Sequence, residues 1–262
     1  MKLSLYQIDA FSDRVFGGNP AAIVPLAHWL DDAVMQAIAA ENNLAETAFY
    51  VPEGDGFALR WFTPTCEVDL CGHATLAAAW LLFFERGYQG EVVNFTTRSG
   101  VLAVSRHADG LQMDFPVLST EPCDPPDLLA RGLGIPVEEC YRGMDYMVVV
   151  ADAAVVAGLA PDFPVLAKLD RRGVVVTAPG EDGVDFVSRF FAPGAGIDED
   201  PVTGSAHCML TPYWAKHLGR THLSARQLSP RGGEIGCELR GERVVLAGRA
   251  ALYLRGEIHI DD

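Results

Sequence analysis

The feature that most constrains this fold is an internal repeat. The segment "RWFTPTCEVDLCGHATLAAAWLLFFERG" runs from Arg60 to Gly87, and "RFFAPGAGIDEDPVTGSAHCMLTPYWAKHLG" runs from Arg189 to Gly219. Each copy opens with Arg, two aromatic residues, a small residue and Pro, and continues into a loop of acidic and small residues. Each loop ends in Gly, a polar residue and Ala, and the same spacing then leads to a final glycine. Duplication explains this shared order better than chance, and it predicts two similar domains of about 120 residues.

Hydrophobic periodicity supports the same organisation. A nearly all-apolar helix is predicted at 74–87, so it should be buried, and its counterpart is predicted from about 204 to 217. An amphipathic helix is predicted at 30–43. Strands are predicted at 3–10, 21–25, 47–51, 57–62, 92–100, 101–106, 146–151, 173–179 and 185–191. A buried helix among strands predicts a sheet that wraps around a helix. The irregular, proline-rich stretch 117–129 marks the expected domain boundary, between 117 and 118.

Both copies place a small tripeptide at a predicted helix start, Gly72-His73-Ala74 and Gly204-Ser205-Ala206. The first-turn N–H groups lack partners within the helix and carry the positive end of its dipole, so they can bind a carboxylate or an enolate oxygen. Glycine lets a ligand approach the backbone closely. If the two domains face each other about a pseudo-twofold axis, both helix starts point into one cleft that suits a small anion.

The amino-acid composition excludes some kinds of function for this chain. Apolar residues make up 49% of the chain and charged residues 21%, which are globular proportions. The formal net charge of −15 makes nucleic acid an unfavourable partner. No apolar run reaches the ~18 residues of a membrane span, and the N-terminus has no signal-peptide pattern. The six cysteines show no zinc-binding spacing, so we expect no metal site and a reduced, cytoplasmic protein.

Three side chains are candidate proton carriers. His73 can act as acid, base or donor near neutral pH, although it can equally cap its helix. Asp200 precedes the second helix start, where Asp and Ser commonly serve as capping residues. Glu46 lies in "NNLAETAFY", where apolar neighbours would partly desolvate its carboxylate, although a solvated loop position is the plainer alternative. Cys71 can be a thiol acid or base, or a small buried hydrophobe.

At these residues the chain resembles the PhzF family of phenazine-biosynthesis-like isomerases. The resemblance rests on "DAFSDRVFGGNPAAIV", "NLAETAFY", "RWFTPTCEVDLCGHATLAAAW" and "DEDPVTGSAHC", and it runs along nearly the whole chain. It implies the diaminopimelate-epimerase-like α/β (α+β) fold, with two pseudo-symmetric domains that each wrap a curved mixed sheet around a central helix. The implied domains are 1–117 and 118–250, with the C-terminal strand, within 251–262, returning to the first domain.

The resemblance also implies roles for individual residues. Glu46 matches the family's general acid/base, which takes a proton from one carbon of a cyclic amino acid, dihydro-hydroxyanthranilate, and returns a proton at another. Gly72 and His73 match the family's "GH" pair, and Asp200 and Ser205 match the Asp and Ser of "DPVTGS". Gly204 joins Gly72 and Ser205 as an expected donor to a small carboxylate substrate, with Cys71 beside them. The resemblance further implies that the reaction uses no metal or organic cofactor, and that the protein is a homodimer.

Related epimerases supply the alternative hypothesis. Diaminopimelate epimerase and proline racemase are similar in fold and use one cysteine at each helix start as opposed base and acid. This chain has Cys71 at the first start and Asp200-Pro201-Val202 before the second, so a thiol pair is incomplete. A Cys71–Asp200 or Cys71–Glu46 pair keeps amino-acid epimerisation or racemisation open. A non-catalytic small-molecule-binding protein on the same scaffold is the third possibility.

Overall fold

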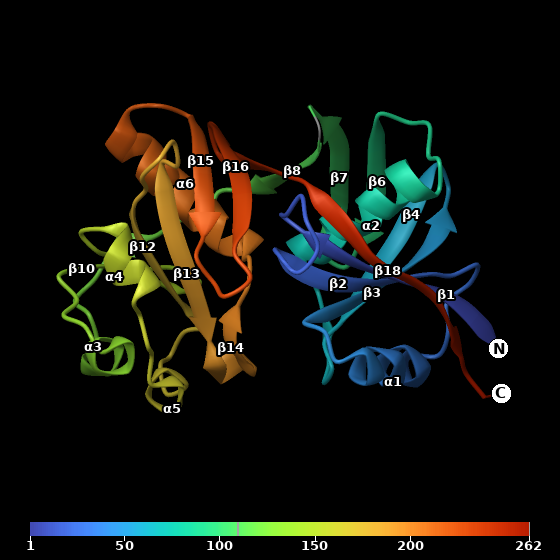
Figure 1. Cartoon of the computed structure of the whole chain (residues 1–262), viewed down its shortest axis with the longest axis horizontal. Coiled ribbons are helices and arrows are strands. Elements are labelled where there is room, and N and C mark those ends of the chain that lie inside the picture. Colours follow the sequence, from blue (N-terminus) through green and yellow to red (C-terminus); the bar gives the residue numbers. More distant parts are fainter. Residues whose placement is uncertain (109, 262) are drawn as a thin grey trace. The chain divides into compact units, whose positions relative to one another are not determined.

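The computed structural model describes residues 1–108 and 110–261. The chain forms two compact units (Figure 1). Unit 1 consists of Met1–Asp114 together with Ala247–Asp262, and unit 2 consists of Phe115–Leu246. The C-terminal segment is therefore part of the unit that contains the N-terminus, and Figure 1 draws both ends of the chain beside β1 and β18.

The strands of unit 1 form a mixed sheet. β1 pairs antiparallel with β2, β2 pairs parallel with β3, and β3 pairs antiparallel with β4. Beyond the helix α2, β6 pairs parallel with β4 and antiparallel with β7, while β18 pairs antiparallel with β1. The elements are β1 Lys2–Ala10, β2 Asn19–Pro25, α1 Asp32–Asn42, β3 Glu46–Glu53, β4 Gly56–Phe62, β5 Glu67–Val68, α2 Gly72–Trp80, the π-helix η1 Leu81–Glu85, β6 Val92–Thr97, β7 Gly100–His107, β8 Gly110–Pro116 and β18 Ala250–His259.

Unit 2 repeats this pairing order. β10 pairs antiparallel with β11, β11 parallel with β12, and β12 antiparallel with β13. Beyond the helix α6, β15 pairs parallel with β13 and antiparallel with β16. The elements are β9 Glu121–Pro122, α3 Asp127–Leu133, β10 Glu139–Arg142, β11 Tyr146–Val149, α4 Ala153–Ala157, α5 Phe163–Leu166, β12 Val174–Pro179, β13 Phe186–Ala192, η2 Pro193–Ala195, β14 Ile197–Asp200, α6 Gly204–Leu218, β15 His222–Gln227, β16 Gly233–Arg240 and β17 Arg243–Gly248. The duplicated topology confirms the predicted mixed α/β fold.

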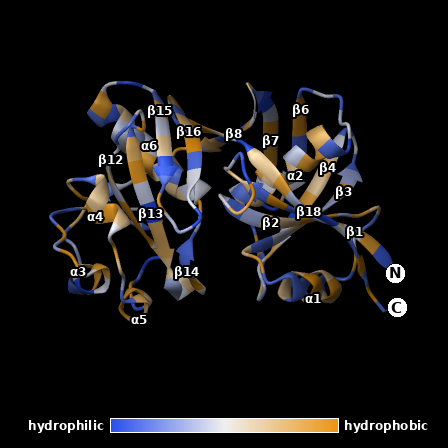
Figure 2. Cartoon of the chain, viewed as in Figure 1, coloured by the Kyte–Doolittle hydropathy of each residue, from blue (hydrophilic) through white to orange (hydrophobic). Residues whose placement is uncertain are grey.

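Each sheet encloses one helix. Every residue of α2 from His73 to Ala79 is buried, and the helix contacts strands β1, β2, β3, β7 and β18. Small alanine side chains let these strands approach the helix closely. In unit 2, Trp214 of α6 stacks on Phe186 of β13, and its Nε1 donates a hydrogen bond to Thr177 Oγ1 of β12 at 3.0 Å. Hydrophobic residues are concentrated on these strands and helices, whereas β14 is hydrophilic (Figure 2).

Two local expectations needed correction. The helix expected at 74–87 begins two residues earlier, and its last turn becomes the π-helix η1 before Gly87 adopts a φ of 68°. The stretch expected to be irregular at 117–129 contains β9 and the start of α3. Pro126 is the residue before the first turn of α3, where a missing N–H costs nothing because that donor has no partner within the helix.

Candidate functional site

The starts of α2 and α6 share one backbone arrangement. The residue before each helix is extended, with φ −145° and ψ 109° at Cys71 and φ −113° and ψ 100° at Thr203. Among the described residues, neither of these side chains accepts a hydrogen bond from its own first turn. The N–H groups that begin at Gly72 and Gly204 are therefore not capped in this usual way, and they keep the capacity to bind an anion.

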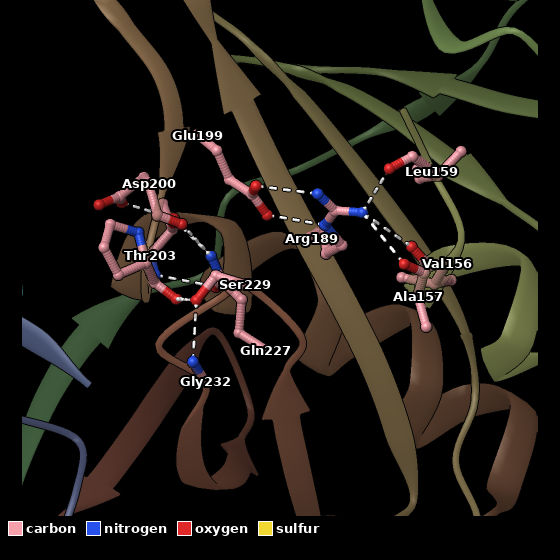
Figure 3. Close-up of polar contacts among 11 residues, drawn as sticks. Val156, Ala157, Leu159, Arg189, Glu199, Asp200, Thr203, Gln227, Ser229 and Gly232 are labelled. Carbon is pink, nitrogen blue, oxygen red and sulfur yellow. Dashed lines mark hydrogen bonds and ion pairs between the residues drawn. The ribbon is translucent and has the colours of Figure 1, made fainter. Parts of the chain in front are cut away.

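A matching arginine–glutamate pair holds each loop that leads into these helices. Arg60 Nε donates to Glu67 Oε1 at 2.7 Å and its Nη2 donates to Oε2 at 2.8 Å. Arg189 makes the same two-pronged contact with Glu199, at 2.7 and 2.9 Å (Figure 3). Each guanidinium also lies over the phenylalanine ring two positions further along the chain, at 5.2 and 5.0 Å from the centroid. The bidentate geometry fixes both loops in the same way.

Three of the predicted site residues meet at the start of α2. Glu46 is the first residue of β3, and its side chain is 13% exposed. Its Oε2 lies 3.3 Å from His73 Nε2. On the other side of the imidazole, His73 Nδ1 lies 3.5 Å from the thiol sulfur of Cys71. The fold thus brings together residues from two separate sequence motifs, with a thiol and a carboxylate on opposite edges of one imidazole.

Burial sets the charge of this cluster. Because the imidazole of His73 is withdrawn from water, its pKa falls to about 3, so the ring is neutral at physiological pH. The approach of Glu46 is therefore a contact between a carboxyl group and a neutral ring. A neutral imidazole has one donor and one acceptor nitrogen. When Nε2 carries the ring proton, Nδ1 is an acceptor 3.5 Å from the Cys71 thiol.

The same cluster contains the donor types of a metal site. Glu46, Cys71 and His73 each offer one ligand atom, and these atoms lie within 4.8 Å of one another. Nitrogen, sulfur and carboxylate oxygen together suit a borderline ion such as Zn²⁺. The sequence-based expectation of a metal-free protein stays a prediction.

The predicted residue Asp200 belongs to a separate hydrogen-bond network in unit 2. Thr203 Oγ1 donates to Asp200 Oδ2 at 2.6 Å, and Gln227 Nε2 donates to the Asp200 carbonyl at 2.7 Å. Gln227 Oε1 in turn accepts from the backbone N–H of Thr203 at 2.9 Å (Figure 3). Gln227, which is fully buried, therefore ties β15 to the loop before α6. No sequence pattern singles out Gln227, because it lies outside the repeated motif.

Ser205 is held by an arginine that the motifs did not indicate. Arg172 Nη2 donates to Ser205 Oγ at 2.9 Å. The same guanidinium donates to both carboxylate oxygens of Asp145, at 2.9 and 2.5 Å, and lies over the ring of Phe190. Asp145 is fully buried, whereas the side chain of Arg172 is 39% exposed. This buried carboxylate thus holds a partly exposed positive charge at the start of α6.

His207 and Cys208 are buried in α6, with exposed fractions of 0% and 3%. His207 Nδ1 lies 2.8 Å from the Thr203 carbonyl and donates to it, and burial lowers the pKa of the ring to about 4. At the matching position in α2, Thr75 Oγ1 donates to the Cys71 carbonyl at 2.6 Å. Both helices thus tie a first-turn side chain back to the residue before the helix.

The starts of α2 and α6 lie in different units, so the expected common cleft stays a prediction. Glu46, His73, Cys71 and Gly72 are in unit 1, and Asp200, Gly204 and Ser205 are in unit 2.

In the described part of the chain, no helix is both long and apolar enough to cross a membrane.

Comparisons with known proteins cover the whole chain. The PhzC-PhzF family, described as "Phenazine biosynthesis-like protein", matches residues 8–256. A protein of Pseudomonas aeruginosa named "uncharacterized isomerase" is 55% identical over 260 residues, which cover 99% of this chain and 100% of that protein.

Solved structures agree with this match. A PhzF-family phenazine biosynthesis protein of Enterococcus faecalis has a TM-score of 0.96 and 49% identity, over 99% of this chain and 100% of the other. A hydroxyproline epimerase of Agrobacterium vitis shares the fold, with a TM-score of 0.65 and 11% identity over 100% of this chain and 93% of the other. The predicted fold class is confirmed.

Proposed function

This chain belongs to the PhzC-PhzF family of phenazine biosynthesis-like proteins, and on that premise we propose that it shifts a proton on a small, carboxylate-bearing, amino-acid-like substrate, without a cofactor. Relatives named isomerases match it along its whole length, and it is an isomerase of this family. The observation that carries the finer proposal is the buried cluster of Glu46, His73 and Cys71.

Glu46 is the proposed acid and base. Its carboxylate takes a proton from one carbon of the substrate, so that a C–H bond breaks and its electron pair enters a conjugated system. The same carboxyl group then gives a proton to another carbon, where a new C–H bond forms, and Glu46 returns to its starting state. A neutral His73 beside it, at 3.3 Å, adds no positive charge that would compete with proton transfer by the carboxyl group.

The start of α6 is the proposed binding element for the substrate's carboxylate. Ser205 and the N–H groups that begin at Gly204 supply donors, and Arg172 adds a positive charge 2.9 Å from the serine hydroxyl. Ser205 Oγ accepts the hydrogen bond from Arg172, so the hydroxyl proton of Ser205 stays available to a ligand. Asp200 and Gly72 are proposed to contact other polar groups of the substrate.

Epimerisation through Cys71 is the second candidate, and the 3.5 Å contact between its sulfur and His73 Nδ1 favours it. In that mechanism Cys71 and a carboxylate act on opposite faces of one carbon. The residue before α6 that corresponds to Cys71 is Thr203, whose hydroxyl donates to Asp200, so the second base would be Asp200 or Glu46. Incorporation of solvent deuterium at a single stereocentre, with inversion of that centre, distinguishes this reaction from a proton shift between two carbons.

The test is a solvent-exchange screen by NMR in D₂O against cyclic and acyclic amino and hydroxy acids. We expect the wild-type protein to introduce deuterium at a carbon of at least one acid, and we expect Glu46→Gln to bind that acid without exchange. Glu53→Gln is the matched control, because Glu53 is exposed at the opposite end of the same strand. Equal exchange by wild type and Glu46→Gln would exclude the proposed role. Ligand-induced stabilisation without exchange by any variant would instead support a non-catalytic binding protein.

A further inference from the structure

Two cysteines outside the repeated motif lie side by side in unit 2. The sulfur atoms of Cys123 and Cys140 are 3.4 Å apart, and both thiols are free. Cys140 lies on β10 and is 5% exposed, while Cys123 directly follows β9 and is partly exposed. Both pack in the hydrophobic core of unit 2. The proposed function uses neither thiol.

The strand register places these residues directly opposite each other. β9 and β10 pair antiparallel, with Pro122 opposite Tyr141 and Glu121 opposite Arg142. One step further along this register, Cys123 faces Cys140, and the Cys123 N–H donates to the Cys140 carbonyl at 3.0 Å. Opposed residues of antiparallel strands have Cα atoms about 4.5 to 5.5 Å apart, which is within the range of disulfides. A bond would need the sulfur atoms to approach by only about 1.4 Å.

We propose that Cys123 and Cys140 are a reversible oxidation site, at which a small-molecule disulfide such as oxidised glutathione converts the two thiols into an intramolecular disulfide. Cys123 is the first to react, because it is the more exposed of the pair. Burial, and then the neighbouring Cys123, raise the pKa of the Cys140 thiol to about 12, so Cys140 is a poor first nucleophile.

The electron balance is that of thiol–disulfide exchange. The Cys123 thiolate attacks one sulfur of the small disulfide and releases one small thiol. Cys140 then loses its proton to solvent, and its sulfur attacks Cys123 Sγ to displace the second small thiol. Two protein thiols are oxidised by two electrons in total, and the small disulfide is reduced to two thiols. Excess small thiol reverses both steps.

Peptide mapping of the native, full-length protein tests the proposal. The protein is equilibrated in glutathione buffers of increasing oxidised fraction, quenched in acid, alkylated and digested with trypsin. Arg131 lies between the two cysteines, so cleavage separates them into peptides 107–131 and 132–142. We expect these peptides to appear as a linked pair that is two hydrogens lighter than their sum and that disappears on reduction. The proposal would be overturned if Cys123 and Cys140 were both still alkylated in the most oxidising buffer. Glutathionylation of the exposed Cys66 in the same sample would show that the buffer is oxidising enough.

Two variants sharpen the result. Cys140→Ser removes the resolving thiol, so we expect Cys123 to accumulate as its mixed disulfide with glutathione. Cys66→Ser is the matched control and should leave the linked pair unchanged. A stable mixed disulfide on Cys123 in the wild-type protein would also contradict the proposal, because it would show that Cys140 does not resolve it. The wild-type peptide map decides the matter even if Cys140→Ser does not fold.

Discussion

The start of α2 and the start of α6 have the same scaffold and different chemistry. In both units an Arg–Glu pair holds the preceding loop, an extended residue precedes a glycine, and a first-turn side chain bonds back to that residue. Around α2 the polar groups are a carboxyl, an imidazole and a thiol, which can all carry protons. Around α6 they are the hydroxyl groups of Thr203 and Ser205, the carboxylate of Asp200, which accepts from Thr203, and the guanidinium of Arg172.

This difference suggests a division of labour between two copies of one ancestral element. The scaffold supplies helix N–H donors at both sites, because backbone geometry does not depend on the side chains that diverged. The side chains near α2 suit proton transfer, whereas a guanidinium stays charged at any physiological pH and suits an anion. Substitutions at the two starts should therefore affect different kinetic parameters.

The largest effect is expected from Glu46→Gln, which keeps the shape of the side chain and removes its basicity. General acid–base catalysis typically contributes 10² to 10⁴-fold, so we expect kcat to fall by about that factor. Ser205→Ala should instead raise KM and leave kcat within a few-fold. Steady-state kinetics on an acid found by the exchange screen measure both. Equal losses of kcat in the two variants, with KM unchanged in both, would refute the division of labour.

A smaller effect is expected where Arg172 meets Asp145. Arg172→Gln leaves the buried Asp145 without its charged partner, and because Arg172 is 39% exposed we expect a loss of about 2 kcal/mol in unfolding free energy. We also expect KM to rise about tenfold, which corresponds to a loss of about 1.4 kcal/mol in binding free energy.

The double variant Arg172→Gln/Asp145→Asn separates these two roles. Asparagine removes the buried unpaired charge, so denaturant unfolding should show part of the lost stability restored. KM should stay raised, because the positive charge at α6 is still missing. Recovery of KM together with stability would show that Arg172 has only a structural role.

The two buried histidines predict a loss of stability in mild acid. Burial lowers the pKa of His73 to about 3 and that of His207 to about 4, while an unfolded histidine titrates near 6.5. Between these values the unfolded chain binds more protons than the folded one. Stability is therefore complete above pH ~6.5 and falls as the pH drops, by about 2 kcal/mol for each histidine at pH 5.

Urea unfolding at pH 7 and pH 5 measures this loss, and His73→Asn should reduce it by about half. His222→Asn is the matched control, because the side chain of His222 is 77% exposed. An unchanged pH dependence in His73→Asn would contradict this, because it would show that His73 takes up its proton at the same pH in the folded and unfolded protein. A larger loss in His73→Asn would show that His73 is already protonated in the folded protein, as the partner of a Glu46 carboxylate.

Much of the fold could be predicted from the sequence because the repeat and the hydrophobic periods are local patterns. Most long strands and both central helices fall close to their expected positions. Strands β15 and β16 were not expected, because their apolar residues are separated by charged, polar and glycine residues. Strand β17 was not expected either, because its apolar run is only four residues long. The short helices α3 to α5 offer too few turns for a periodic signal.

The candidate site was predictable only where it coincides with motifs. Glu46 and His73 were singled out separately, and their 3.3 Å approach depends on how β3 packs against α2. Arg172 and Asp145 escaped notice, because 27 positions separate them and neither belongs to a recognisable pattern. The charge at the start of α6 is thus a product of tertiary structure, which explains why the motifs alone made the two helix starts look more alike than they are.

The smallest effect is expected from Cys71→Ser. If Glu46 carries the proton in both directions, the thiol only fixes the tautomer of His73 through the 3.5 Å contact with Nδ1. The hydroxyl group of serine is also a hydrogen-bond donor, so it can replace the thiol in that role. We expect kcat to change by less than about tenfold, which is below the range of a lost acid or base. Exchange kinetics of Cys71→Ser and Glu46→Gln, measured side by side on one substrate, make the comparison. A loss as large as that of Glu46→Gln would give the thiol an equal share in proton transfer and favour the two-base epimerase mechanism.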